Sequence, residues 1–494
     1  MTRGPETMTK RPNIIFLFTD DQRFDTIAAL GCPEIETPNM NRLVKRGTSF
    51  TNAHIMGGTH VAVCMPSRAM MLTGRTLFSL ENQGQCIPSE HITFPEWFRS
   101  SGYETCHIGK WHQDVESHHR AFSTGRKIYG FHRNGWYETC NGHWHTPVHD
   151  YDPTGKYEQD TFYNDPPLEP FSAPFESTKA KGKHSAEMLT DSALEYMRER
   201  REAPDENPYL MYFAHLAPHD PRQYPERLSE RYNADTVSLP ENFATTHPFD
   251  NGEMYVRDEL LEGMPRRPKA VQQHVADYYA IIAHVDEQIG RILDDLEASG
   301  EDENTVVILA GDNGLACGQH GLMGKQNLYE HSIRVPLVMA GPGIPKNQRS
   351  DTFCYLLDIF PTLCDLLGVE KPETLEGRSL APCFSDPSHQ IRESLHFAYR
   401  GFQRAVKKDH FKLIEYVVGK KRATQLFDLS LDPLEMNNLA DHPVFASVQA
   451  GLREELKKWR DEFHDTRVVG DSFWDHFDSD ELLPPWRPGS HVHE

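Results

Sequence analysis

A short segment, residues 64–75, combines a cysteine, a cation and strong helix signals. It reads CMPSRAMMLTGR. Pro66 is typical of a helix start and Gly74 of a helix end, so a short helix is expected directly after Cys64. The positive end of that helix favours an anion at residue 64, and Arg68 adds a permanent cation on the same side. Taken alone, these features also fit an inert cysteine buried at a helix cap.

Two apolar runs of the strand type, residues 13–19 and 305–309, each end in side chains that carry oxygen ligands. These are Asp20 and Asp21 after the first run, and Asp312 and Asn313 after the second. Because α/β sheets place ligands at the carboxyl ends of their strands, the four groups are expected to meet. Three carboxylates and an amide oxygen suit a hard cation such as Ca²⁺ or Mg²⁺. An Asp-Asp pair alone fits a helix cap equally well.

Four further polar side chains lie in short motifs along the chain. They are Lys110 and His112 in GKWH, His219 in PHDP, and Lys325 in GLMGK. Each motif is weak by itself. An isolated lysine is usually a solvated surface charge, and a Lys-Trp-His string is usually a surface turn.

In their order along the chain, these segments resemble the motifs of the type I sulfatase family, the formylglycine-dependent sulfatases of the alkaline phosphatase superfamily. Residues 64–75 match every fixed position of its signature, C-x-P-S-R-x-x-x-L-T-G-R. The resemblance implies that a maturation enzyme oxidises Cys64 to formylglycine, an aldehyde. A hydrated aldehyde carries two hydroxyls on one carbon. One can attack sulfur and expel the alcohol, and the other, once deprotonated, can expel sulfate and restore the aldehyde.

The resemblance also implies a role for each remaining motif residue. The implied metal is one Ca²⁺ per chain, with the ligands Asp20, Asp21, residue 64, Asp312 and Asn313. The implied sulfate-neutralising cations are Arg68, Lys110 and Lys325. His112 would take the hydroxyl proton that lets sulfate leave, and His219 would hydrogen-bond the sulfate or the leaving oxygen. Lys325 would also help to protonate the leaving group.

Charge and composition limit the possible partners. The chain has 494 residues, 38% of them hydrophobic, and a net charge of −22, which is typical of a soluble globular protein that repels nucleic acid and anionic membranes. Its nine cysteines include no Cys-x-x-Cys pair, which argues against a zinc cluster or a dense disulfide framework. The N-terminal apolar run is too short for a signal peptide and no run could span a membrane. A cytoplasmic location is expected, or a periplasmic or secreted one if a native leader precedes this sequence.

Alternating helices and buried strands predict an α/β fold. The expected strands are 13–19, 209–214, 305–309 and 335–340, and the expected helices are 186–200 and 271–298. Residues 113–185 are expected to form long loops. The resemblance implies a large mixed-sheet, alkaline-phosphatase-like catalytic domain over residues 1–385. A smaller α+β domain is expected over 386–470, with a helix at 445–463, followed by a tail over 471–494.

The sequence indicates the substrate less clearly than the reaction. His143 and His145 lie in the His-rich and Tyr-rich loops and are candidates for sugar contacts, while Arg222 is a candidate second anionic subsite. We expect a sulfatase acting on an O-sulfated carbohydrate, such as a glycosaminoglycan or another polysaccharide fragment. The alternatives are an aryl or alkyl sulfatase, or a phosphodiester or phosphonate monoester hydrolase on the same fold. A two-metal phosphatase is disfavoured because Asn313, not histidine, follows Asp312. The complete motif set argues against a non-catalytic binder of sulfated glycans.

Overall fold

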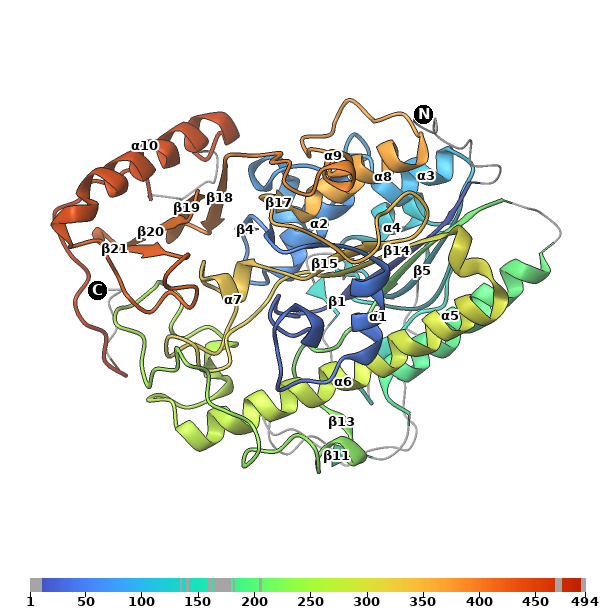
Figure 1. Cartoon of the computed structure of the whole chain (residues 1–494), viewed down its shortest axis with the longest axis horizontal. Coiled ribbons are helices and arrows are strands. Elements are labelled where there is room, and N and C mark those ends of the chain that lie inside the picture. The colour runs from blue at the N-terminus through green and yellow to red at the C-terminus, as the bar shows by residue number, and fades with distance from the viewer. Residues whose placement is uncertain are drawn as a thin grey trace.

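The computed structural model describes residues 11–133, 136–138, 142–144, 146–157, 161–162, 179–180, 183–203, 207–466 and 473–489. Its largest element is an eight-stranded sheet with the strand order β16-β2-β15-β14-β1-β12-β5-β6 (Figure 1). The strands are β1 Asn13–Thr19, β2 Gly47–Phe50, β5 Glu104–Lys110, β6 Thr124–Tyr129, β12 Tyr209–Ala214, β14 Thr305–Gly311, β15 Leu337–Ala340 and β16 Gln348–Ser350. Strands β14, β1, β12, β5 and β6 are parallel, whereas β15 is antiparallel to both its neighbours. The predicted α/β fold with a mixed sheet is confirmed.

Helices cover both faces of this sheet, as Figure 1 shows. Side chains alternate along β1, so Phe16 and Phe18 belong to one buried cluster and Ile15 and Leu17 to the other. The helices on the first face are α2 Cys64–Thr73, α3 Phe94–Ser100, α4 Val115–Ala121 and α8 Ile359–Leu367. Those on the second face are α1 Pro38–Arg46, α5 Ser185–Glu202 and α6 Pro268–Ser299. Burial on both faces explains why the central strands are continuously apolar.

The strand register brings the motif residues to one edge of the sheet. Thr19, the last residue of β1, lies opposite Gly311, the last residue of β14. On the other side of β1, β12 pairs with Phe18 at Ala214, and Ala214 in turn pairs with Gly109 of β5. The segments that follow these strands carry the polar motifs, so parallel pairing alone gathers them.

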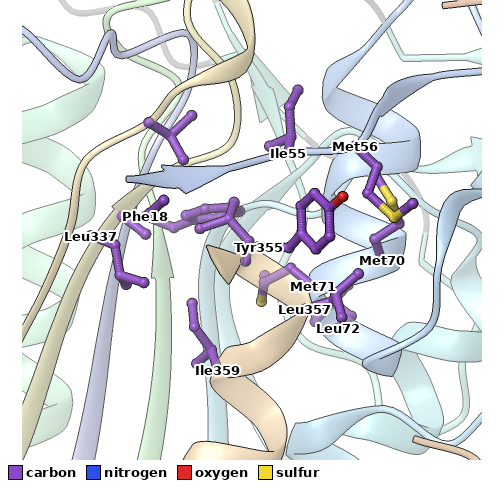
Figure 2. Packing of buried hydrophobic residues seen from close by; sticks show 14 of the residues in the cluster. Phe18, Ile55, Met56, Met70, Met71, Leu72, Leu337, Tyr355, Leu357 and Ile359 are labelled. Atoms are coloured by element: carbon purple, nitrogen blue, oxygen red, sulfur yellow. The ribbon is translucent and has the colours of Figure 1, made fainter. Parts of the chain in front are cut away.

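Helix α2 is fixed beside this edge by its apolar side chains. Figure 2 shows Met70 and Met71 packed beside Tyr355 and Leu357, within the same buried cluster as Phe18 of β1. The helix begins at Cys64 itself, whereas the sequence predicted a start just after it. Residue 64 is therefore the first residue of a fully buried helix.

A second, five-stranded sheet has the order β21-β20-β19-β18-β4. Its strands are β4 Gly57–Gly58, β18 Ser394–Tyr399, β19 Gln403–Lys408, β20 Phe411–Val418 and β21 Lys421–Asp428. Helix α10, Ala446–Phe463, packs on it through Leu452 and Leu456, together with Phe473 and Phe477 of the tail. The edge strand β4 comes from the segment just before α2, so the two sheets are joined close to residue 64.

Short elements complete the fold. The remaining strand pairs are β3 Ala53–His54 with β17 Cys354–Tyr355, β7 His132–Arg133 with β8 Trp136–Tyr137, β9 Pro147–Val148 with β10 Thr161–Phe162, and β11 Lys179–Ala180 with β13 Tyr224–Pro225. The remaining α-helices among the described residues are α7 Glu330–Ile333 and α9 Ala381–Ser385. No helix in the described ranges combines the length and apolar character that a membrane span needs.

One expectation from the sequence was wrong. Residues 113–185 were expected to form long loops, but they contain helix α4 and strand β6. Strand β5 was not predicted at all. Its sequence ETCHIGK mixes polar and apolar residues, so it lacks the apolar run that identifies the neighbouring strands.

Candidate active site

Three buried carboxylates and the Cys64 thiol converge at the carboxyl edge of the large sheet. Single ligand atoms of Asp20, Asp21, Asp312 and Cys64 all lie within 4.8 Å of one another. Asp21 adopts a left-handed φ of 66°, which turns the chain back across the end of β1. Its backbone N–H donates to Asp312 Oδ1 at 2.9 Å. The ends of β1 and β14 are thereby locked together.

The oxygens of this cluster fit a hard divalent cation. Asp20 Oδ1 and Asn313 Oδ1 are buried and accept no hydrogen bond from any described residue. Asn313 Nδ2 donates to Asp21 Oδ1 at 2.6 Å, which leaves the amide oxygen as its free ligand atom. Burial and the nearby Asp20 carboxylate raise the pKa of Asp312 to about 7. A divalent cation would offset this concentration of negative charge.

Three cationic side chains surround the acidic cluster. Arg68 Nε donates to Asp312 Oδ2 at 2.9 Å, and Lys110 Nζ pairs with Asp20 Oδ2. Burial opposes charge on the lysine, but Asp20, together with Tyr137 and Cys64, more than offsets this effect, so the pKa of Lys110 is raised. For Asp20, burial would raise the pKa, but Lys110 and His219 bring it well below its usual value. Lysine and carboxylate therefore both carry charge at neutral pH.

Residue 64 faces the third cation. Lys325 Nζ lies 2.8 Å from Cys64 Sγ and 2.6 Å from Asp21 Oδ1. The Cys64 side chain is buried, and burial raises its pKa well above the usual value, with Lys325 opposing and the carboxylates reinforcing the shift. The unmodified side chain is therefore a neutral thiol rather than a reactive thiolate.

Two histidines line the site and differ in environment. His112 is buried and stacks on Tyr137 with ring centroids 4.4 Å apart. Burial, Lys110 and Arg68 hold the pKa of His112 well below its usual value, so the ring is neutral at pH 7. His219 is partly exposed, with Nε2 3.7 Å from Asp21 Oδ2 and Nδ1 2.7 Å from the backbone oxygen of Asp220.

These groups line a cavity of about 320 Å³. Its polar lining includes Asp20, Cys64, Lys110, His112, His219 and Lys325. Its other walls contain Val61, Tyr129, Tyr137, Leu216 and Val256, with Asp220, Arg257 and Asp258 also present. The cavity can hold a small anion against the cations and an uncharged ring or chain against the walls.

Two of the three predicted substrate contacts, Arg222 and His143, do not belong to this lining. Arg222 is buried, and its NH1 lies 3.0 Å from His274 Nδ1. His143 is also buried, and its ring hydrogen-bonds Ser185 Oγ and the backbone oxygen of His219. Its position supports the His219 loop rather than a ligand. His145 lies outside the described residues.

Several lining residues carried no signal in the sequence. Arg257 pairs with Asp220 and with Asp258, and all three line the cavity. Arg257 and Asp258 lie in the irregular segment 220–270, where no motif or periodicity marks them, whereas Asp220 belongs to the PHDP motif but was given no role there. Tyr137 lies on the short strand β8, which pairs antiparallel with β7.

Comparison with known proteins adds independent information. A family model described as sulfatase matches residues 12–369, and a model described as the C-terminal part of N-sulphoglucosamine sulphohydrolase matches residues 318–462. The chain is 27% identical to an N-acetylglucosamine-6-O-sulfatase from Bacteroides thetaiotaomicron, over 92% of this chain and 88% of that protein. It is also 27% identical to an ulvan-active sulfatase from Formosa agariphila, over 92% of this chain and 82% of that protein.

Solved structures share the fold at lower identity. One, solved in complex with its substrate D-glucosamine-2-N,6-O-disulfate, superposes with a TM-score of 0.70 at 23% identity and covers 93% of this chain and 99% of its own. Another, the phosphonate monoester hydrolase of Agrobacterium radiobacter, gives a TM-score of 0.72 at 21% identity, over 92% and 96% of the two chains.

Proposed function

The chain belongs to the sulfatase family and is a sulfuric ester hydrolase, and we propose that its substrate is an O-sulfated carbohydrate. The relatives named for N-acetylglucosamine-6-O-sulfate and ulvan support a saccharide. The cavity supports it as well, because Tyr129 and Tyr137 line it beside the cationic groups.

One observation carries the proposal. The signature residue Cys64 lies in a single cavity with two lysines, two histidines and an acidic cluster that come from distant parts of the chain. A buried, uncharged thiol does not account for such an arrangement. An anionic substrate bound in front of residue 64 does, because its charge can be matched locally in a protein with a net charge of −22.

We further propose that a maturation enzyme converts Cys64 to formylglycine, as is general in this family. The hydrated aldehyde would supply two hydroxyls on one carbon, one for attack on sulfur and one whose deprotonation releases sulfate. The high pKa of the Cys64 thiol supports this view, since the unmodified side chain is a poor nucleophile at neutral pH.

The acidic cluster is proposed to hold one Ca²⁺ through Asp20, Asp21, Asp312 and Asn313. The unpartnered oxygens of Asp20 and Asn313, together with the charge repulsion around Asp312, support this assignment. Bound there, the ion would add positive charge beside the substrate anion and residue 64.

Of the remaining side chains, some bind the sulfate group and others transfer protons. Lys110 and Lys325 bind sulfate oxygens, and Arg68 holds Asp312 in place through its 2.9 Å contact. Neutral His112 accepts the proton whose removal releases sulfate. His219 and Lys325 face the leaving oxygen and supply the proton that it needs.

A panel of substrates tests this proposal. Release of inorganic sulfate is measured with O-sulfated monosaccharides and an aryl sulfate, and release of the leaving alcohol is measured with a phosphodiester and a phosphonate monoester. Sulfated sugars should be turned over best, and Cys64→Ala should lower turnover on the order of 10³-fold or more. Cys86→Ser is the matched control, because Cys86 does not line the cavity. Preference for the phosphorus esters, or full activity of Cys64→Ala, would contradict the proposal.

A further inference from the structure

The loop that carries Lys325 is held by a carboxylate to which no role has been given. Glu259 lies in the turn Glu259–Leu261 and is 1% exposed. Its Oε2 accepts the backbone N–H of Met323 at 2.9 Å, and its Oε1 accepts that of Gly324 at 2.9 Å. These two N–H groups belong to the residues just before Lys325. One carboxylate therefore fixes the backbone conformation that sets the direction of the lysine side chain.

A buried arginine completes this arrangement. The Arg266 side chain is fully buried and pairs with the Glu259 carboxylate. Its Nε also donates to the backbone oxygen of Gly321 at 2.9 Å. The pair therefore holds both ends of the short segment 321–324. Isolated buried charges are costly, and a buried pair that contacts backbone groups so specifically is suited to fixing geometry rather than adding stability.

Close packing at Gly324 shows how tightly the loop is held. A Cβ atom at this position would lie 2.9 Å from Glu259 Oε1 and 2.5 Å from Gln326 Oε1. Gln326 Nε2 in turn donates to Asp258 Oδ2 at 2.7 Å. The neighbouring residues Asp258 and Glu259 thus hold Gln326 and Gly324, one on each side of Lys325.

We propose that Glu259 is a positioning residue that sets the place of Lys325 Nζ against residue 64 and the substrate. The proposal rests on the proposed function, in which Lys325 binds sulfate and serves the leaving oxygen. A lysine side chain has several free rotations, yet this one must keep contacts of 2.8 Å to Cys64 and 2.6 Å to Asp21. A displacement of about 1 Å in an active site can cost about 100-fold in rate.

Substitution of Glu259 by glutamine tests the idea with little change in shape. In wild type each carboxylate oxygen accepts one backbone N–H, whereas glutamine would put an NH₂ donor opposite one of these two N–H groups, so the loop before Lys325 should shift. We expect kcat/KM for a sulfated sugar to fall about 10- to 100-fold. The loss for 4-nitrophenyl sulfate should be several-fold smaller, because a good leaving group needs little protonation. Glu259→Asp keeps the charge beside Arg266 but withdraws the carboxylate by one methylene, so it should show the same pattern with a smaller loss of thermal stability than Glu259→Gln.

The matched control is Glu262→Gln. This neighbouring carboxylate pairs with Arg267 and His274 and makes no contact with the 321–324 segment among the described residues. It should leave both substrates within about twofold of wild type. Equal losses for Glu259→Gln and Glu262→Gln, or equal losses for both leaving groups, would overturn the proposal.

A double-mutant cycle gives the decisive comparison. If Glu259 acts through Lys325, then Glu259→Gln should cost less than about twofold once Lys325 is already alanine. Independent, multiplying losses would overturn the proposal. The same cycle can be measured without turnover, as the affinity for inorganic sulfate determined by calorimetry. If the variants show this coupling in sulfate binding but the protein hydrolyses no sulfate ester, the proposed function is refuted and the positioning role of Glu259 stands.

Discussion

Each cation around residue 64 is already paired with a carboxylate of the acidic cluster. Lys110 pairs with Asp20, Arg68 with Asp312, and Lys325 with Asp21. These pairs hold the cations in place before a substrate arrives, so little reorganisation is needed when charge develops on the transferring group. At the residue scale, the site is a fixed pattern of charge rather than a set of mobile side chains.

The acidic cluster predicts a strong response to metal removal. A chelator should lower both activity and the thermal midpoint, and added Ca²⁺ should restore them, because an ion that binds only the folded state at about 100-fold excess over Kd stabilises it by about 3 kcal/mol. Elemental analysis, scanning calorimetry and sulfate release would be measured together. An Asp21→Asn variant is the control and should lose most of the response. Full activity in metal-free protein would contradict the assignment.

The environment of His112 predicts the direction of a pH shift. Lys110 helps to hold the pKa of His112 below its usual value, so wild-type kcat should persist as pH falls through 6.5, the value for an ordinary histidine. Lys110→Met should raise that pKa. The base would then be protonated at higher pH, and the acid limb of the kcat profile should move upward. An unmoved limb in the variant would show that His112 is not the base.

Part of this site could be found from sequence and part could not. Cys64 and the acidic residues follow strand and helix boundaries with distinctive spacing, so their convergence follows from parallel strand pairing. Arg257 and Glu259 lie in an irregular segment without periodicity, and nothing local marks the long-range contacts they make. Arg222 shows the converse, since its position beside the PHDP motif suggested a ligand contact that its burial against His274 does not support.

Helix α2 shows how a single element places the signature residue. It is fully buried, begins at Cys64 and ends at Gly74, whose φ of 65° is left-handed. The signature glycine thus closes the helix, while Met70 and Met71 pack it beside the sheet (Figure 2). A fixed helix end therefore holds residue 64 against the acidic cluster.

This geometry makes Gly74 a sensitive position. An alanine there would need the left-handed conformation, and its Cβ would lie 2.3 Å from Leu375 Cδ2. Gly74→Ala should reduce the free energy of unfolding by about 1–3 kcal/mol, measured by denaturant titration. Gly451→Ala in the exposed face of α10 meets no atom within 4 Å and should be neutral or slightly stabilising. A smaller loss at Gly74 than at Gly451 would contradict the packing argument.

Helices and strands with a clear apolar pattern were predicted accurately, and those without one were not. Strands β1 and β12 were predicted at their observed bounds, and helix α6 within three residues at its start and one at its end, because continuous runs and a long amphipathic stripe mark them. Strand β5 escaped prediction because its burial depends on neighbours that only the tertiary fold supplies.

At the scale of the whole molecule, a buried ionic network joins the smaller sheet to helix α7 of the catalytic part. Glu330 of α7 pairs with Lys407 of β19 and Lys412 of β20, and all three side chains are at most 5% exposed. Glu330 follows Lys325 by five residues in the chain. The smaller sheet is thus bonded to the segment that carries a proposed active-site lysine.

This network predicts cooperative unfolding. Glu330→Gln removes the carboxylate partner of buried Lys407, while Lys412 keeps Glu435, and should cost about 3–5 kcal/mol. Scanning calorimetry should show one transition, moved to lower temperature as a whole. Glu454→Gln removes an exposed pair on α10 and should change stability by less than about 1 kcal/mol. Two separate transitions would show that the sheets unfold independently.

The edge strand β4 has a practical consequence for protein engineering. Chimaeras that exchange C-terminal halves between relatives would normally be cut near residue 385. Such a cut would leave Gly57 and Gly58 behind, although they pair with Ala398 and Tyr399 of the exchanged half. A working hybrid should therefore carry residues 57–58 of the donor along with its C-terminal half. The contact between the two parental parts then includes Gly58, which lies only six residues before position 64.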